Sequence, residues 1–89
     1  MLLTKSQNIA DSELDGEICI FDSNSGEYFN LNKSASFIWK LLDKYHSEEQ
    51  IISYVLDSFE SDSADIRKEV IDFLKNGKKL GLITCTSEK

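Results

Sequence analysis

Short runs of apolar residues separated by turn residues occupy the first third of the chain and predict β-strands. The clearest run is 17–22, which is rich in residues that favour strands; a second run spans 27–31, and a weaker strand lies within 7–14. Asp15-Gly16 predicts a hairpin turn, because glycine tolerates the positive φ that such turns need, and 23–26 is a second cluster of turn residues. The pattern therefore predicts a three-stranded antiparallel meander.

From Asn32 onward apolar residues recur three or four positions apart, which predicts helices over 33–44, 47–59 and about 63–80. Asn32 is a good N-cap for the first helix, and Ser47 begins a capping box for the second. The apolar positions of the three helices are Ala35, Ile38, Leu41 and Leu42, then Ile51, Ile52, Val55, Leu56 and Phe59, then Ile66, Val70, Phe73, Leu74 and Leu80. Three strands followed by three helices predict an α+β fold of the winged helix-turn-helix type.

Two glycines and one tryptophan add detail to the helices. Gly77 lies on the apolar side of the last helix, where glycine costs about 1 kcal/mol relative to alanine, so the close approach of another backbone would explain it. Gly81 is suited to end that helix, and 82–84 would return as a short strand or an extended tail. Trp39 lies among apolar helix residues and is expected in the core.

Length and composition indicate a single small domain over 1–89, with strands within about 7–31, helices within about 33–80 and a short C-terminal tail. Hydrophobic residues make up 40% of the chain, as in folded globular proteins. No apolar run approaches the about 18 residues of a membrane span, and residues 1–5 lack the apolar stretch of a signal peptide. We interpret the chain as cytoplasmic, with no membrane partner.

No catalytic or metal-binding motif is visible in the sequence. Cys19 and Cys85 are the only cysteines and His46 is the only histidine, too few for a zinc site. Cys19 is interpreted as a small buried residue and Cys85 as a tail residue, and a disulfide is not expected in a cytosolic protein. Nothing offers His46 a nucleophile at a plausible spacing. The sequence predicts a protein that is not an enzyme and uses no metal or cofactor.

Charge is unevenly distributed within a net charge of −6. Residues 1–62 carry four lysines and twelve acidic residues, whereas 63–89 carry six basic and four acidic residues. An acidic chain is a poor candidate for nucleic acid, because phosphate contacts supply most of that affinity. Half of the basic residues lie on the last predicted helix, namely Arg67, Lys68, Lys75, Lys78 and Lys79. Lys78 and Lys79 near its end also suit the helix dipole, which is an alternative explanation of these residues that needs no partner.

The strand at 27–31 carries an aromatic residue on each face, Tyr28 and Phe29. A strand with one solvated face should be polar on that face. Either one ring is core and the other covers a helix flank, or the strand is a sheet edge whose open side is completed by a partner peptide. In the second case, a groove between this strand and the last helix would be apolar at its base and basic at its rim. Such a groove would suit an extended peptide with apolar anchors and acidic flanks.

Several segments occur in an order typical of one family of peptide-binding proteins. They are Ile20-Phe21-Asp22, the Gly-Glu-Tyr-Phe-Asn-Leu-Asn of 26–32, Ile38-Trp39-Lys40-Leu41-Leu42-Asp43, the helix from Ser47 to Phe59, and the helix from Asp65-Ile66 to Phe73-Leu74 that closes on Leu80-Gly81-Leu82-Ile83. This set resembles the PqqD-like family of peptide chaperones, also called RiPP recognition elements, over about 17–84. The chain departs from the family at Lys44-Tyr45-His46, where a glycine is common, and at Gly77. Its 26–32 segment is more similar to stand-alone members from lasso-peptide clusters than to members serving pyrroloquinoline quinone synthesis.

The resemblance implies a winged helix-turn-helix-like fold and a function in peptide capture. The leader segment of a ribosomally made precursor would add as an antiparallel strand beside 27–31, pack on the last helix and be presented to a modifying enzyme or leader peptidase. Such a chaperone does no chemistry and raises the local concentration of the precursor at its partner. The residues expected to contact the peptide are Glu27, Tyr28, Phe29, Asn30, Leu31, Ile66, Arg67, Val70, Ile71, Leu74, Lys75 and Lys78. Because strand neighbours alternate between faces, not all of the strand side chains can face one groove.

Two other functions stay open on the sequence. A winged-helix DNA-binding regulator would share the gross fold and a basic third helix, although the acidic excess of 1–62 opposes it. A non-catalytic small subunit of an enzyme complex would also need no motif of its own.

Overall fold

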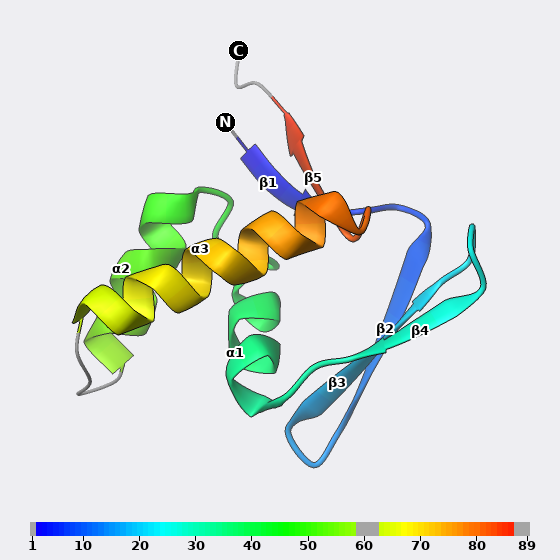
Figure 1. Cartoon of the computed structure of the whole chain (residues 1–89), viewed down its shortest axis with the longest axis horizontal. Helices are drawn as coiled ribbons and strands as arrows, with labels where there is room; N and C mark the ends of the chain where they lie inside the picture. The colour runs from blue at the N-terminus through cyan, green and yellow to red at the C-terminus, as the bar shows by residue number, and fades with distance from the viewer. Residues whose placement is uncertain (1, 59–62, 87–89) are drawn as a thin grey trace.

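The computed structural model describes residues 2–58 and 63–86, and it places the predicted elements in the predicted order (Figure 1). The elements are β1 (Leu2–Lys5), β2 (Ile9–Leu14), β3 (Glu17–Asp22), β4 (Glu27–Asn30), α1 (Lys33–Leu41), α2 (Glu48–Ser58), α3 (Ser63–Lys79) and β5 (Ile83–Thr86). The fold is α+β: an antiparallel sheet of order β2-β3-β4 precedes the three helices. In Figure 1 this sheet lies to one side of α1, α2 lies to the other, and α3 runs across the molecule towards β5.

A second, two-stranded sheet pairs β1 with β5 and was not predicted. Leu3 stands opposite Cys85 in this antiparallel pair, and its side chain is buried. Cys85 is therefore part of a strand rather than of a tail, and Cys19 is half-buried on the outer face of β3 rather than core. Four-residue strands that pair across most of the chain leave no local periodicity, which is why the pattern of 2–5 carried no signal.

The predicted turn and helix caps are confirmed. Asp15 and Gly16 both have positive φ, 55° and 83°, which is the conformation of a type I′ hairpin turn. The side chain of Asn32 accepts a hydrogen bond from the Ala35 amide at 2.8 Å, and that of Ser47 accepts one from the Gln50 amide at 3.1 Å. The first helix ends at Leu41, earlier than predicted, and Phe59 of the second predicted helix lies outside the described residues.

Helix α3 ends in a Schellman motif centred on Gly81. The Leu82 amide donates to the Gly77 carbonyl at 2.9 Å and the Gly81 amide donates to the Lys78 carbonyl at 3.2 Å, with Gly81 at φ +80°. Gly77 itself is required by a side chain, not by another backbone as predicted: an added Cβ would lie 2.9 Å from Cγ1 of Ile83 and closer still to its Cδ1. The turn thus brings the start of β5 against the end of α3, so that the Ile83 side chain packs on Gly77.

Trp39 is fully buried and joins α1 to the sheet. Its Nε1 donates a hydrogen bond to Oδ2 of Asp11 at 2.6 Å, and Nζ of Lys5 lies 3.3 Å from the same oxygen. The core around it consists of Leu3, Ile18, Ile20, Ile38, Leu41, Leu42, Ile51, Ile52, Val55, Ile66, Val70, Leu74, Leu82 and Ile83. The predicted core position of Trp39 is confirmed, and α1 lies between the sheet and α2 (Figure 1).

The Asp11 carboxylate makes stability depend on acid pH. The hydrogen bond from Trp39 lowers the pKa of Asp11 below its ordinary value of 3.8, partial burial opposes this, and the nearby Lys5 charge adds to the lowering. A pKa that is lower in the folded chain than in the unfolded chain gives a contribution that is complete above about pH 4 and is lost as pH falls through the folded value. Thermal melts should therefore show stability falling below about pH 4. The Asp11→Asn variant should show a shallower fall, and an unchanged slope would contradict this role.

Candidate functional site

Strand β4 forms an open edge of the three-stranded sheet. Among the described residues it pairs only with β3, because the sheet order is β2-β3-β4 and β5 pairs with β1 instead. The Leu31 amide donates to the Ile18 carbonyl at 2.8 Å, and bonding alternates along an antiparallel strand. The backbone N–H and C=O groups of Tyr28 and Asn30 therefore point away from β3. The open edge predicted from the sequence is confirmed, and it offers two donors and two acceptors.

The two faces of β4 differ in burial. Phe29 and Leu31 are half-buried and pack against the core, whereas Tyr28 is 69% exposed. The Tyr28 ring packs on Phe21 of β3 with 4.9 Å between ring centroids, on the outer face of the sheet. Phe29 is thus the inward-facing ring, and Tyr28 remains on the surface beside the open edge.

A groove of about 400 Å³ lies between β4 and the C-terminal half of α3. Its lining residues are Tyr28, Phe29, Asn30 and Leu31 on the strand side, Phe73, Asn76, Gly77 and Leu80 on the helix side, and Trp39 and Leu82. Leu80 is 49% exposed although it is a large apolar residue. The groove combines apolar side chains with unpaired backbone groups at the edge of β4.

A buried serine holds the end of β4 in position. The Ser36 hydroxyl accepts a hydrogen bond from the Ile18 amide at 2.8 Å and donates one to the Leu31 carbonyl at 3.3 Å. Ser36 is fully buried on α1. Its two bonds therefore join α1 to Ile18 of β3 and to Leu31, the residue after β4 that still pairs with β3. The groove wall at Leu31 is therefore fixed to the core rather than formed by a free loop.

The structure brings together only some of the residues expected to contact a peptide. Four of the five strand residues line the groove, and Glu27 lies exposed at the start of β4. Val70 and Leu74 are fully buried in the core and do not line it, and Ile71 is half-buried on another side of α3. Ile66 lines a different hollow.

The basic residues predicted for the rim lie on another flank of α3 than the groove. Arg67, Lys75 and Lys78 do not line the groove. At 3.6 residues per turn they fall on the flank of α3 opposite to Phe73 and Leu80. Arg67 instead pairs with Glu49 of α2, with 3.8 Å between its NH1 nitrogen and the Glu49 carboxylate.

Sequence reasoning missed the helix residues that do line the groove. Phe73, Asn76 and Gly77 of α3 and Leu80 directly after it follow one another at intervals of three, one and three, so they continue one flank of the helix beside its buried face. The signal was present in Phe73 and Leu80, which belong to the predicted apolar side of the last helix together with Val70 and Leu74, but only Val70 and Leu74 were expected to contact a peptide. Burial separates the two sets, because Leu80 is half-exposed and Leu74 is fully buried.

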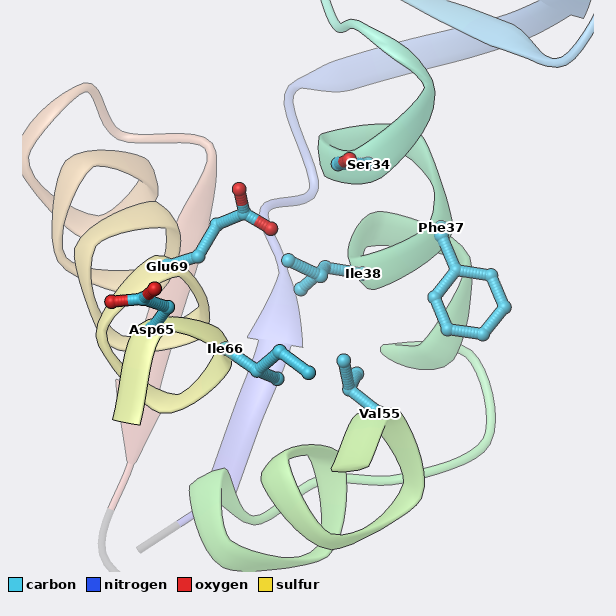
Figure 2. Close-up of a pocket in the computed structure, with 7 residues that line it drawn as sticks. All are labelled: Ser34, Phe37, Ile38, Val55, Asp65, Ile66 and Glu69. Carbon is cyan, nitrogen blue, oxygen red and sulfur yellow. The ribbon is translucent and has the colours of Figure 1, made fainter. Parts of the chain in front are cut away.

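A second hollow, of about 340 Å³, lies among the three helices next to the N-terminal half of α3 (Figure 2). It is lined by Ser34, Phe37 and Ile38 of α1, Val55 of α2, and Asp65, Ile66 and Glu69 of α3. Figure 2 shows the Glu69 carboxylate pointing from α3 towards Ile38 of α1, whereas the Asp65 carboxylate lies over α3 and points away from α1. This hollow mixes an apolar base with an acidic wall.

Within 2–58 and 63–86 no group of three or more histidine, cysteine or acidic side chains is placed to hold a metal ion. His46 holds β1 in place: its Nδ1–H donates to the Leu3 carbonyl at 3.1 Å, and its own carbonyl accepts from the Leu3 amide at 2.7 Å. No helix among the described residues is long and apolar enough to cross a membrane.

Comparison with known proteins gives one family and two structures. The family model for coenzyme PQQ synthesis protein D (PqqD) matches residues 17–83. A structure described as "TbiB1 in Complex with the TbiA(beta) Leader Peptide" has a TM-score of 0.85 at 22% identity, covering 96% of this chain and 99% of that one. A structure described as "Lasso peptide synthetase B1 complexed with the leader peptide" has a TM-score of 0.83 at 21% identity, covering 96% and 100%. A search of curated proteins gave no match.

Proposed function

The chain belongs to the PqqD family, and on that premise we propose that it binds the leader segment of a ribosomally made precursor peptide. The observation that carries the proposal is the open edge of β4 beside an apolar groove. The two similar structures are described as complexes with leader peptides, which supports the same use of this fold here.

The leader would add as an antiparallel strand on β4. The outward backbone groups of Tyr28 and Asn30 would pair with it, which gives affinity without reading side chains. Side chains of an added strand alternate between faces. Every second leader residue would therefore enter the groove against Phe29, Phe73 and Leu80, and the others would lie beside the Tyr28 ring on the outer face.

The whole chain would act as one leader-peptide-binding domain that does no chemistry. It would present the precursor to a modifying enzyme or leader peptidase in the cytoplasm, raising the effective concentration of the core peptide there. No cofactor, nucleic acid or membrane enters this function.

A selection with random peptides tests the proposal and does not require the sequence of the precursor. A displayed library of random peptides about 14 residues long, about 46 Å when extended, is selected on the immobilised chain. We expect enriched peptides with apolar residues at every second position, and we expect a Leu80→Asp variant to lose them. Exposed Leu14, at the tip of the β2–β3 hairpin, is the matched control: Leu14→Asp should retain them. Failure to enrich any peptide, or equal binding by both variants, would contradict the proposal.

A DNA-binding regulator is the competing function for the exposed basic flank of α3. Titration with duplex DNA distinguishes the two, because strong binding that weakens steeply with salt would favour the regulator.

A further inference from the structure

The second hollow and the groove follow one another along α3. Glu69 of the second hollow lies one turn before Phe73 of the groove, and Ser34 lies three residues after Leu31. Ile38 of α1 lines the second hollow, and its neighbour Trp39 lines the groove. A peptide strand leaving the groove past Leu31 would therefore enter the second hollow.

The chemistry of the second hollow differs from that of the groove. Its base consists of Phe37, Ile38, Val55 and Ile66, and its α3 wall carries Asp65 and Glu69, one turn apart. No lysine or arginine of the described residues forms an ion pair with either carboxylate, whereas Arg67 and Lys68 on the same helix pair with Glu49 and Asp72. Asp65 lies in the first turn, where it complements the helix dipole, but Glu69 lies beyond that turn.

We propose that the second hollow is a subsite for a lysine or arginine side chain of the bound peptide. A long basic side chain buries its aliphatic stem on apolar surface while its charge stays at a polar rim. This matches an apolar base beside the Glu69 carboxylate, with Asp65 one turn away on the same wall. This inference rests on the proposed function. It also reverses the sequence-based expectation of a basic rim and acidic peptide flanks.

The direction of the peptide fixes where that basic residue lies. β4 runs from Glu27 towards Leu31, and the second hollow lies beyond Leu31. A strand that adds antiparallel has its N-terminal end there, so the basic residue precedes the apolar anchors. Asp65 of α3 and Leu80, the residue directly after α3, are fifteen residues apart, about 22 Å. An extended peptide covers that distance in about seven residues.

The same selected peptides test the subsite. Peptides enriched on the native chain should carry lysine or arginine N-terminal to their apolar residues. Replacing that residue with glutamine should weaken binding about two- to fivefold, the range of exposed ion pairs. The same replacement in the peptide should leave its affinity for the Asp65→Asn/Glu69→Gln double variant unchanged. Asp72→Asn is the control, because Asp72 is an acidic residue of α3 that lines neither hollow.

The outcomes separate this inference from the proposed function. Apolar peptides enriched without a basic residue, or an equal cost on native chain and double variant, would overturn the subsite and leave strand addition at β4 standing. An equal effect of Asp72→Asn would assign the preference to the net charge of −6 and overturn the subsite as well. Enrichment of no peptide at all would overturn the proposed function and the subsite with it.

Discussion

Replacing Trp39 with alanine should lower the free energy of unfolding by about 3–5 kcal/mol, the cost of truncating a buried aromatic residue. Trp39 is fully buried, and its Nε1 satisfies Asp11, so the truncation leaves both a cavity and a carboxylate without its closest donor. A chain of this size has about 5–10 kcal/mol of stability in total, so the variant should be largely unfolded at 37 °C or melt far below the native chain. Thermal and denaturant unfolding measure the loss.

Trp39→Phe is the matched control for this experiment. It keeps an aromatic ring in the core and removes the Nε1–H donor, so the loss should be smaller, about 1–2 kcal/mol. If Trp39→Ala melted within a few degrees of the native chain, the account of the core around α1 would be wrong.

Replacing Asn30 with proline should weaken peptide binding about tenfold or more. The Asn30 amide points out from the open edge of β4, so proline removes a donor that the added strand would use and places its ring in the strand's path. The β3–β4 ladder should survive, because its bonds come from Phe29 and Leu31 instead. Calorimetry with an enriched peptide measures the affinity, and a thermal melt checks the fold.

The control separates the backbone from the side chain. Asn30→Ala keeps the amide and removes only the side chain of a residue that lines the groove, so the affinity should fall only a few-fold. Equal losses in the two variants would mean that the Asn30 side chain, not strand addition, binds the peptide. Unchanged affinity in both variants would mean that the peptide does not bind at β4.

Local signals were sufficient for most of the fold. The hairpin turn at Asp15-Gly16 and the caps at Asn32 and Ser47 each depend on a few adjacent residues, and each was predicted correctly. The pairing of β1 with β5 was missed because it joins residues from the two ends of the chain, and four-residue strands carry little periodicity.

The candidate site was predictable from the strand but not from the helix. Tyr28 and Phe29 indicated an unusual strand, and the structure places β4 at an open edge. On α3 a helix has several flanks, and sequence spacing alone does not show which flank faces β4. The cluster of positive charge suggested that the flank with Arg67 and Lys75 borders the peptide groove. Tertiary packing instead places Phe73 and Leu80 in the groove, and Arg67 pairs with Glu49.

Amide hydrogen exchange of β4 reports strand addition at this edge residue by residue. In the free chain the amides of Tyr28 and Asn30 should exchange quickly, while those of Phe29 and Leu31 are already protected by the ladder to β3. Saturation with an enriched peptide should slow exchange at Tyr28 and Asn30 about tenfold or more and leave Phe29 and Leu31 little changed. If the peptide is bound and the Tyr28 and Asn30 amides still exchange as fast as in the free chain, the peptide does not add to β4.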